Sequence, residues 1–279
     1  MSFELLVYSA LFFIFGSAIG SFLNVVIFRF EQGRVLTGRS SCPHCHHLLG
    51  VADLVPLFSF VFLQGKCRYC SRAISWQYPL VELSTAIIFA LSYLWTGYRF
   101  MVVNSDSAGL AVLVSFVYLL FFACVLLVLS VFDLRHGIIP DKILLPATLV
   151  ALVFSIVSAV LKSASVFGVV QLVGLDIITA LGLAGFFLIL ILVTRGRGMG
   201  GGDLKLSIFI GLSLGWPLSL VGIILGFLTG AAVSVMLVLR GKKGFGQTIP
   251  FGPFLALGAY LAALFGSQIL ALYLKTLGF

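Results

Sequence analysis

The chain has 279 residues, of which 61% are hydrophobic and only 9% are charged. A soluble domain of this size needs far more charged side chains to cover its surface, so the composition excludes an ordinary soluble protein. Several apolar runs reach about 20 residues, the length at which a helix crosses the hydrocarbon core of a bilayer. We therefore predict an all-α, polytopic membrane protein with about eight transmembrane helices.

The predicted spans cover, in chain order, residues 4–28, 79–97, 108–132, 144–161, 174–194, 204–218, 219–239 and 250–274. The first span contains Glu4, lacks a basic region before it and is too long for the apolar core of a signal peptide. We expect this span to be retained in the mature protein. The sixth span is short, and Trp216 with Pro217 is expected to form its turn into the seventh.

The basic residues that give the chain its formal net charge of +8 lie mostly in the loops on one side of the predicted spans. One set of loops holds Arg29, Arg34, Arg39, Lys66, Arg68, Arg72, Arg135, Lys142, Arg195, Arg197, Lys205, Arg240, Lys242 and Lys243. The opposite set holds only Arg99, Lys162 and Lys275. This asymmetry is typical of the positive-inside rule, so we expect four cytoplasmic loops and two periplasmic termini. It indicates the lipid bilayer, and no nucleic acid, as the partner of the basic residues.

A polar loop at 29–78, between the first two spans, contains four of the five cysteines. They form the pattern C-x2-C-x21-C-x2-C, made by Cys42, Cys45, Cys67 and Cys70. Two cysteine pairs at this spacing can close a tetrahedral zinc site. Two disulfides are the alternative, but thiols stay reduced in the cytoplasm, where the loop is expected. We predict a small zinc-binding domain in which the metal supplies much of the folding free energy.

Two aspartates among the nine acidic residues stand at the cytoplasmic ends of predicted spans. Asp133 ends the third span and Asp203 begins the sixth, so a helix bundle can bring them together. An acid at membrane depth costs several kcal/mol and indicates a function. Two neighbouring carboxylates share a proton, so one can activate water while the other protonates a leaving group. This is the chemistry of an aspartic protease, and it needs no metal for peptide cleavage.

Three glycines, Gly200 to Gly202, precede Asp203. A backbone without side chains lets an extended peptide approach closely and pair with it as an added strand. We therefore predict that these glycines bind substrate. Lys205 is close enough in sequence to bias the charge of Asp203. The simpler alternative is that Asp203 caps the helix that begins there.

Two other classes of function remain open from the residues alone. In a proton- or ion-coupled transporter, Asp133 and Asp203 would relay protons or bind a cation. In a non-enzymatic assembly factor, the cysteine loop would hold a partner protein. Cleavage of a peptide by the purified protein separates a protease from both.

Five motifs in this chain are similar to those of one family, the bacterial type IV prepilin leader peptidases. They are GSFLNVVIFR at 20–29, the CPHC and CRYCSRAISWQYPLVEL pair ending at residue 83, DLRHGIIPD at 133–141, GMGGGDLKL at 198–206 and IPFGPFLALGA at 249–259. The fourth resembles the family's Gly-x-Gly-Asp motif, with Gly200, Gly202 and Asp203 in the key places. The chain departs from many members at 28–30, where they have a turn that contains proline.

The resemblance implies a bifunctional prepilin peptidase and N-methyltransferase of the bacterial inner membrane, with Asp133 and Asp203 as its catalytic aspartates. The implied substrates are type IV prepilins or type II secretion pseudopilins, cleaved after the glycine of a basic leader at the cytoplasmic membrane face. The new amino terminus would then be methylated from S-adenosylmethionine. A relative that cleaves without methylating is the nearest alternative, but the cysteine loop is typical of the bifunctional members.

The expected organisation has three parts. Residues 1–28 form the first transmembrane helix, 29–78 the cytoplasmic zinc-binding loop associated with methylation, and 79–279 the transmembrane peptidase core. Glu82 opens the second span at the cytoplasmic face. It is predicted to contact the substrate amine or the methyl donor, with a structural ion pair to a loop arginine as the alternative. Asn24 is expected to form a hydrogen bond between helices.

Overall fold

The computed structural model describes residues 3–102, 106–163, 165–196, 199–241 and 249–278. Within these ranges the regular structure is helical, and two isolated β-bridges in the cysteine loop are the only strand-like pairing. Seven of the described helices are long and apolar enough to cross a membrane. The prediction of an all-α, polytopic membrane protein is confirmed. Arg197, Gly198, Lys242 and Lys243 lie outside the described residues.

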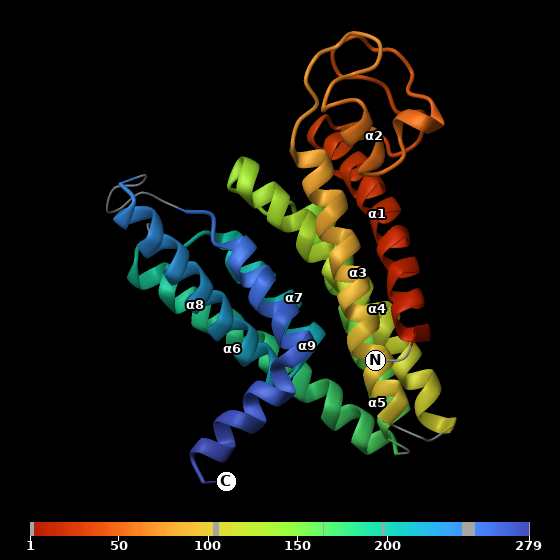
Figure 1. Cartoon of the computed structure of the whole chain (residues 1–279). Helices are drawn as coiled ribbons and strands as arrows, with labels where there is room; N and C mark the ends of the chain where they lie inside the picture. Colours follow the sequence, from red (N-terminus) through yellow and green to blue (C-terminus); the bar gives the residue numbers. More distant parts are fainter. Residues whose placement is uncertain (1–2, 103–105, 164, 197–198, 242–248, 279) are drawn as a thin grey trace. The chain divides into compact units, whose positions relative to one another are not determined.

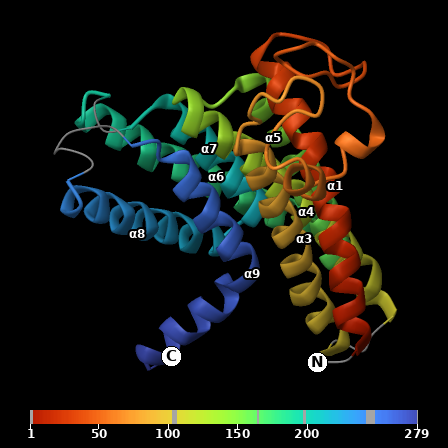
Figure 2. The same ribbon diagram turned by 45° about the horizontal axis from the view of Figure 1, so that its top comes forward.

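The chain divides into two compact units, Met1–Val112 and Leu113–Phe279. In the first unit, α1 (Phe3–Glu31) and α3 (Gln77–Val102) lie side by side, as both ribbon views show (Figure 1, Figure 2). Their contact is close because Gly20 lacks a side chain, and a Cβ there would lie 2.6 Å from the Cα of Glu82. The amide of Asn24 donates to the carbonyl of Tyr78 at 3.0 Å, which confirms the expected hydrogen bond between helices.

The cysteine loop connects α1 to α3 and contains only two short helices, η1 (Val51–Asp53) and α2 (Phe58–Phe62). The guanidinium of Arg29, at the end of α1, donates to the carbonyl oxygens of Val35, Leu36 and Gly38. These bonds fold the first part of the loop over the end of α1.

The second unit contains most of α4 (Asp106–His136) and all of five later helices. These are α5 (Asp141–Lys162), α6 (Val166–Val193), α7 (Gly201–Leu214), α8 (Leu218–Leu239) and α9 (Gly252–Thr276). The helix α7 packs on α6 and α5, whereas α8 and α9 pack on each other. Small residues allow these approaches, since a Cβ on Gly211 would lie 2.6 Å from the Cα of Ala180.

The predicted sixth span, 204–218, corresponds to α7, which is short as the sequence indicated. The helix α7 has 14 residues, so it is about 21 Å long and does not reach across a hydrocarbon core of about 30 Å. It ends at Leu214 because Gly215 adopts φ 64° and Pro217 follows. Trp216 and Pro217 lie in the turn into α8, as expected, and the predicted end of the span at 218 is four residues too late because the turn residues are flanked by apolar side chains.

Candidate functional site

Asp133 lies in the last turn of α4, where the helix ends at Gly137 with φ 64°. Its side chain is buried, and its Oδ2 atom accepts a hydrogen bond of 2.8 Å from the N–H of Gly252. Gly252 is the first residue of α9, and a Cβ there would lie 2.7 Å from the same oxygen. The carboxylate is therefore held against a stretch of backbone that only glycine leaves open.

Asp203 occupies the first turn of α7, and its side chain is also buried. Its Oδ2 atom accepts a bond of 3.3 Å from the N–H of Gly200, and its own N–H donates to the carbonyl of Gly200 at 3.2 Å. Gly200 is the N-cap residue, so Asp203 caps the helix start from the third helical position and not as the N-cap of the alternative interpretation. These bonds also fix the direction of the carboxylate, so capping and catalysis are compatible.

Burial opposes ionisation of Asp203, and the negative charge of Asp133 adds to this effect. Both lie in the second unit and come from helices that are separated in sequence by α5 and α6. Two buried carboxylates that interact in this way favour a state in which they share one proton. Such a pair can take a proton from water and give one to a leaving group.

Further contacts align the two aspartate motifs with each other. A Cβ on Gly202 would lie 3.1 Å from Ile139, so the start of α7 packs directly on the segment that follows Asp133. Nζ of Lys205 donates to both carboxylate oxygens of Asp141 at 2.7 and 2.8 Å. The expectation that Lys205 acts on Asp203 misses this partner, because the partner lies 64 positions away in the chain.

The cysteine loop forms two turns with the same hydrogen-bond pattern. The N–H of Cys42 donates to the carbonyl of His47 at 3.0 Å, and the N–H of Cys67 donates to that of Arg72 at 2.9 Å. His46 and Ser71, at matching positions, have φ 57° and 56°. The loop thus contains two copies of one turn, each closed around a cysteine pair.

These turns bring four thiols together, those of Cys42, Cys45, Cys67 and Cys70. Their Sγ atoms lie within 4.8 Å of one another, a spacing at which one ion can contact all four. Burial opposes ionisation of Cys42, but the N–H groups of Cys45 and His44 lower the pKa of its thiol to about 7. A set of four thiols with one readily ionised member fits zinc.

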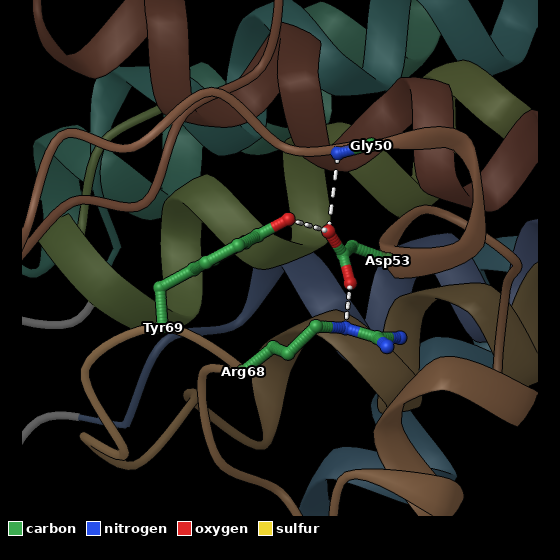
Figure 3. A network of polar contacts seen from close by, with 4 residues as sticks. All are labelled: Gly50, Asp53, Arg68 and Tyr69. Atoms are coloured by element: carbon green, nitrogen blue, oxygen red, sulfur yellow. Dashed lines mark hydrogen bonds and ion pairs between the residues drawn. The ribbon is translucent and has the colours of Figure 1, made fainter.

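Asp53 connects the segment that follows the first cysteine turn to the second turn, as Figure 3 shows. One of its oxygens accepts from the N–H of Gly50 and the hydroxyl of Tyr69, both at 3.1 Å, and the other accepts from Nε of Arg68 at 2.7 Å. Burial opposes ionisation, but the bonds from Gly50 and Arg68 hold the pKa of the Asp53 carboxyl below its usual value. The ring of Tyr69 also packs on His47 of the first turn, at a centroid distance of 3.6 Å.

Glu82 is buried between α1 and α3 and accepts a bond of 2.8 Å from the N–H of Leu57. Ser21 of α1 forms a second hydrogen bond with the same carboxylate. The structure therefore pairs Glu82 with a backbone amide of the cysteine loop and a hydroxyl. These partners differ from the loop arginine of the alternative interpretation, and contact of Glu82 with the substrate amine or methyl donor stays a prediction.

Sequence reasoning missed Gly252, Asp141, Asp53 and Leu57 as partners of the site residues. Gly252 and Leu57 act through backbone N–H groups, which every residue except proline carries, so their identity gives no signal. Asp141 could have been found, since it ends the DLRHGIIPD motif and opens a helix beside Lys205.

Two family models match this chain. Residues 14–96 match the bacterial peptidase A24 N-terminal domain, and residues 120–235 match the type IV leader peptidase family. A prepilin leader peptidase/N-methyltransferase of Aeromonas salmonicida is 32% identical, over 97% of this chain and 95% of that protein. The chain belongs to the type IV leader peptidase family. Proteins of the same name from Bacillus subtilis and Pseudomonas aeruginosa are 34% and 31% identical, each over 95% of this chain and over 98% and 92% of the relative.

No solved structure matches the chain. The second family model covers Asp133, Asp203 and the glycines before Asp203, whereas the first covers all four clustered cysteines and Glu82. Membership of a leader peptidase family gives no support to the transporter alternative.

Proposed function

We propose that this protein is a prepilin leader peptidase in which Asp133 and Asp203 carry out the cleavage. The observation that supports this most strongly is a pair of buried acids at the end of α4 and the start of α7, two segments that pack on each other where Gly202 meets Ile139. Each acid has one oxygen fixed by a backbone N–H, from Gly252 or Gly200. The relatives from Aeromonas salmonicida and Bacillus subtilis are both named prepilin leader peptidase/N-methyltransferase, which supports the proposal.

In the proposed reaction, one carboxylate removes a proton from a water molecule as the water oxygen attacks the scissile carbonyl carbon. The protonated partner then donates its proton to the amide nitrogen as the C–N bond breaks. No metal is needed for these steps. The N–H bonds from Gly252 and Gly200 hold both acids in place while the proton positions change.

The glycine segment before Asp203 is the proposed binding surface for the leader. A Cβ on Gly201 would meet nothing within 4 Å, and one on Gly200 would meet only a backbone nitrogen at 3.9 Å. An extended peptide can therefore approach the backbone of Gly200 and Gly201, whereas Gly202 lies against the side chain of Ile139. We assign cleavage to the core at 79–279, with prepilins or secretion pseudopilins as substrates, cut after the glycine of the leader.

We further propose that the cysteine loop at 29–78 binds zinc through Cys42, Cys45, Cys67 and Cys70 and is required for N-methylation. S-adenosylmethionine would supply the methyl group to the new amino terminus. The bifunctional names of the relatives and the arrangement of the four thiols support this assignment. The distribution of basic residues supports an inner-membrane location with cytoplasmic basic loops and periplasmic termini.

The proposal is tested by incubating purified protein with a prepilin, with and without S-adenosylmethionine, and weighing the products by mass spectrometry. We expect a shortened product in both cases and an added methyl group only when the methyl donor is present. Asp133→Asn and Asp203→Asn should give no shortened product. Asp176→Asn is the matched control, since Asp176 lies in the same unit but is bonded to Ser155. Cleavage by either catalytic variant at the unmodified rate would reject the assignment.

A further inference from the structure

One side of α2 is apolar but uncovered by the rest of the first unit. Phe58, Val61 and Phe62 are 64%, 71% and 81% exposed. They stand at positions i, i+3 and i+4 of a helix and so share one face, which we call the α2 face. Three large apolar side chains left open together mark a contact with an apolar partner.

The opposite side of α2 is occupied by the loop itself. The ring of Phe60 packs on that of Trp76 at a centroid distance of 5.1 Å. A Cβ on Gly65 would lie 3.1 Å from the same phenylalanine ring. The helix is therefore held in a fixed orientation, so the exposure of the α2 face is a property of the folded loop.

The residue before α2 is hydrogen-bonded to a side chain of a membrane-spanning segment. Leu57, which precedes the helix, donates its N–H to Glu82 at 2.8 Å, and it does so with φ 62°. Left-handed backbone is unfavourable for leucine, so the buried carboxylate stabilises a conformation that the chain would otherwise avoid. Glu82 belongs to the segment Gln77–Gly97 and lies five residues, or about 7 Å, beyond its start.

The residues around α2 complete a pattern found at membrane surfaces. Trp76 is exposed at the entry to α3, where aromatic rings gather at the boundary between headgroups and acyl chains. Lys66, four positions after Phe62, is exposed and able to meet anionic headgroups. An apolar helical face flanked by basic and aromatic side chains is typical of a helix that lies in the interface.

We propose that α2 is an interfacial membrane element and that Phe58, Val61 and Phe62 insert among the acyl chains beside α1 and α3. Glu82 then acts as a positioning residue, because it fixes how deeply the loop enters the bilayer. The inference depends on membrane insertion alone and not on which activity the protein has.

The test places the full chain in lipid nanodiscs, either unmodified or with the substitution Phe62→Trp. The difference between the two tryptophan emissions is the emission added by the new side chain. Lipids brominated on their acyl chains report contact with the bilayer interior, and iodide reports contact with water. We expect the added emission of Phe62→Trp to fall by roughly half in brominated lipid and to change little with iodide, as for a residue about 5–10 Å below the surface. His44→Trp, on the exposed first cysteine turn, should show the opposite response.

Bound zinc, measured in each variant, verifies that the loop is folded. Added emission from Phe62→Trp that is quenched by iodide but not by brominated lipid would overturn the inference, because the α2 face would then meet water. Protection from both quenchers would also overturn it, since protein would cover the face. Because the probe reports lipid contact, its failure would leave the assignment of Asp133 and Asp203 untouched.

A second variant tests the role of Glu82 in the same nanodiscs. Glu82→Gln keeps an oxygen that can accept from Leu57, whereas Glu82→Leu removes it. We expect amide exchange at residues 57–62 to rise at least tenfold in Glu82→Leu and to change little in Glu82→Gln. Equal exchange in both variants and in the unmodified protein would show that Glu82 does not hold α2.

Discussion

The four cysteines meet within a short piece of chain, with Cys42 and Cys70 separated by 28 positions. Asp133 and its partner Gly252 are separated by 119 positions, and Asp203 comes from a third helix between them. Turns and a metal ion are enough to bring the four cysteines together, because closing a short loop costs little chain entropy. The aspartate pair depends instead on the packing of α4, α7 and α9, so disturbing one region should leave the other intact.

The largest expected effect is the loss of the proposed metal. Cys42→Ser should reduce bound zinc from about one ion per chain to almost none and unfold the loop, because the metal supplies most of its stability. Methylation should be lost while prepilin cleavage continues. Metal analysis and both activity assays measure this, and Cys124→Ser, which changes a cysteine outside the cluster, is the control. Equal loss of methylation and cleavage would show that the cysteine loop and the aspartate pair are not independent of each other.

The next effect concerns the fit of Asp133 against α9. Gly252→Ala places a methyl group where only 2.7 Å is available to the carboxylate oxygen, so the acid must move. A displacement of about 1 Å at a reacting group can lower the rate about 100-fold. We expect this fall in cleavage while bound zinc stays unchanged.

Gly185→Ala is the matched control for that substitution, because a Cβ at Gly185 meets nothing within 4 Å. It should cleave at the unmodified rate. Full activity in Gly252→Ala would show that the contact between Gly252 and Asp133 does not position the acid.

A smaller effect is expected within the cysteine loop. Asp53→Ala removes the acceptor shared by Gly50, Arg68 and Tyr69 and so loosens the second cysteine turn. Groups that orient metal ligands typically change affinity by 10- to 100-fold, and we expect about tenfold weaker zinc binding. Competition with a zinc chelator measures it. Asp53→Asn retains an acceptor oxygen, so its zinc affinity should lie between those of the unmodified protein and Asp53→Ala. An unchanged zinc affinity in Asp53→Ala would show that Asp53 does not orient the cysteine turn.

The smallest expected effect is at the pair of Lys205 and Asp141. Both side chains are about half exposed, so the pair contributes at most about 1 kcal/mol and is weakened by salt. Lys205→Ala and Asp141→Ala should each slow cleavage a few-fold, and the double variant should be no slower than either single one. Additive losses in this double-mutant cycle would show that the two residues do not act together.

The sequence predicted the spanning helices because each apolar run is long, and it predicted the cysteine cluster because its spacing is local. It also placed Asp133 and Asp203 at the same membrane face. It predicted that the sixth span is short, but it placed the end of that span at 218, four residues beyond Leu214, because glycine and proline within apolar sequence hardly change hydropathy.

Other partners depend on packing between distant segments. The N–H of Gly252 reaches Asp133 only when α9 begins beside the end of α4. In the same way, Glu82 meets Leu57 only after the loop folds back on α3. Neither donor differs chemically from any other backbone amide, so no residue pattern could identify it.

The most direct test of the central claim is the mass of a prepilin after incubation with Asp133→Asn, Asp203→Asn and the control Asp176→Asn, each purified with its zinc content measured. We predict an uncut prepilin with the first two proteins, a shortened one with the third and equal zinc in all three. A shortened product from Asp133→Asn or Asp203→Asn at the unmodified rate would contradict a reaction carried out by these two acids.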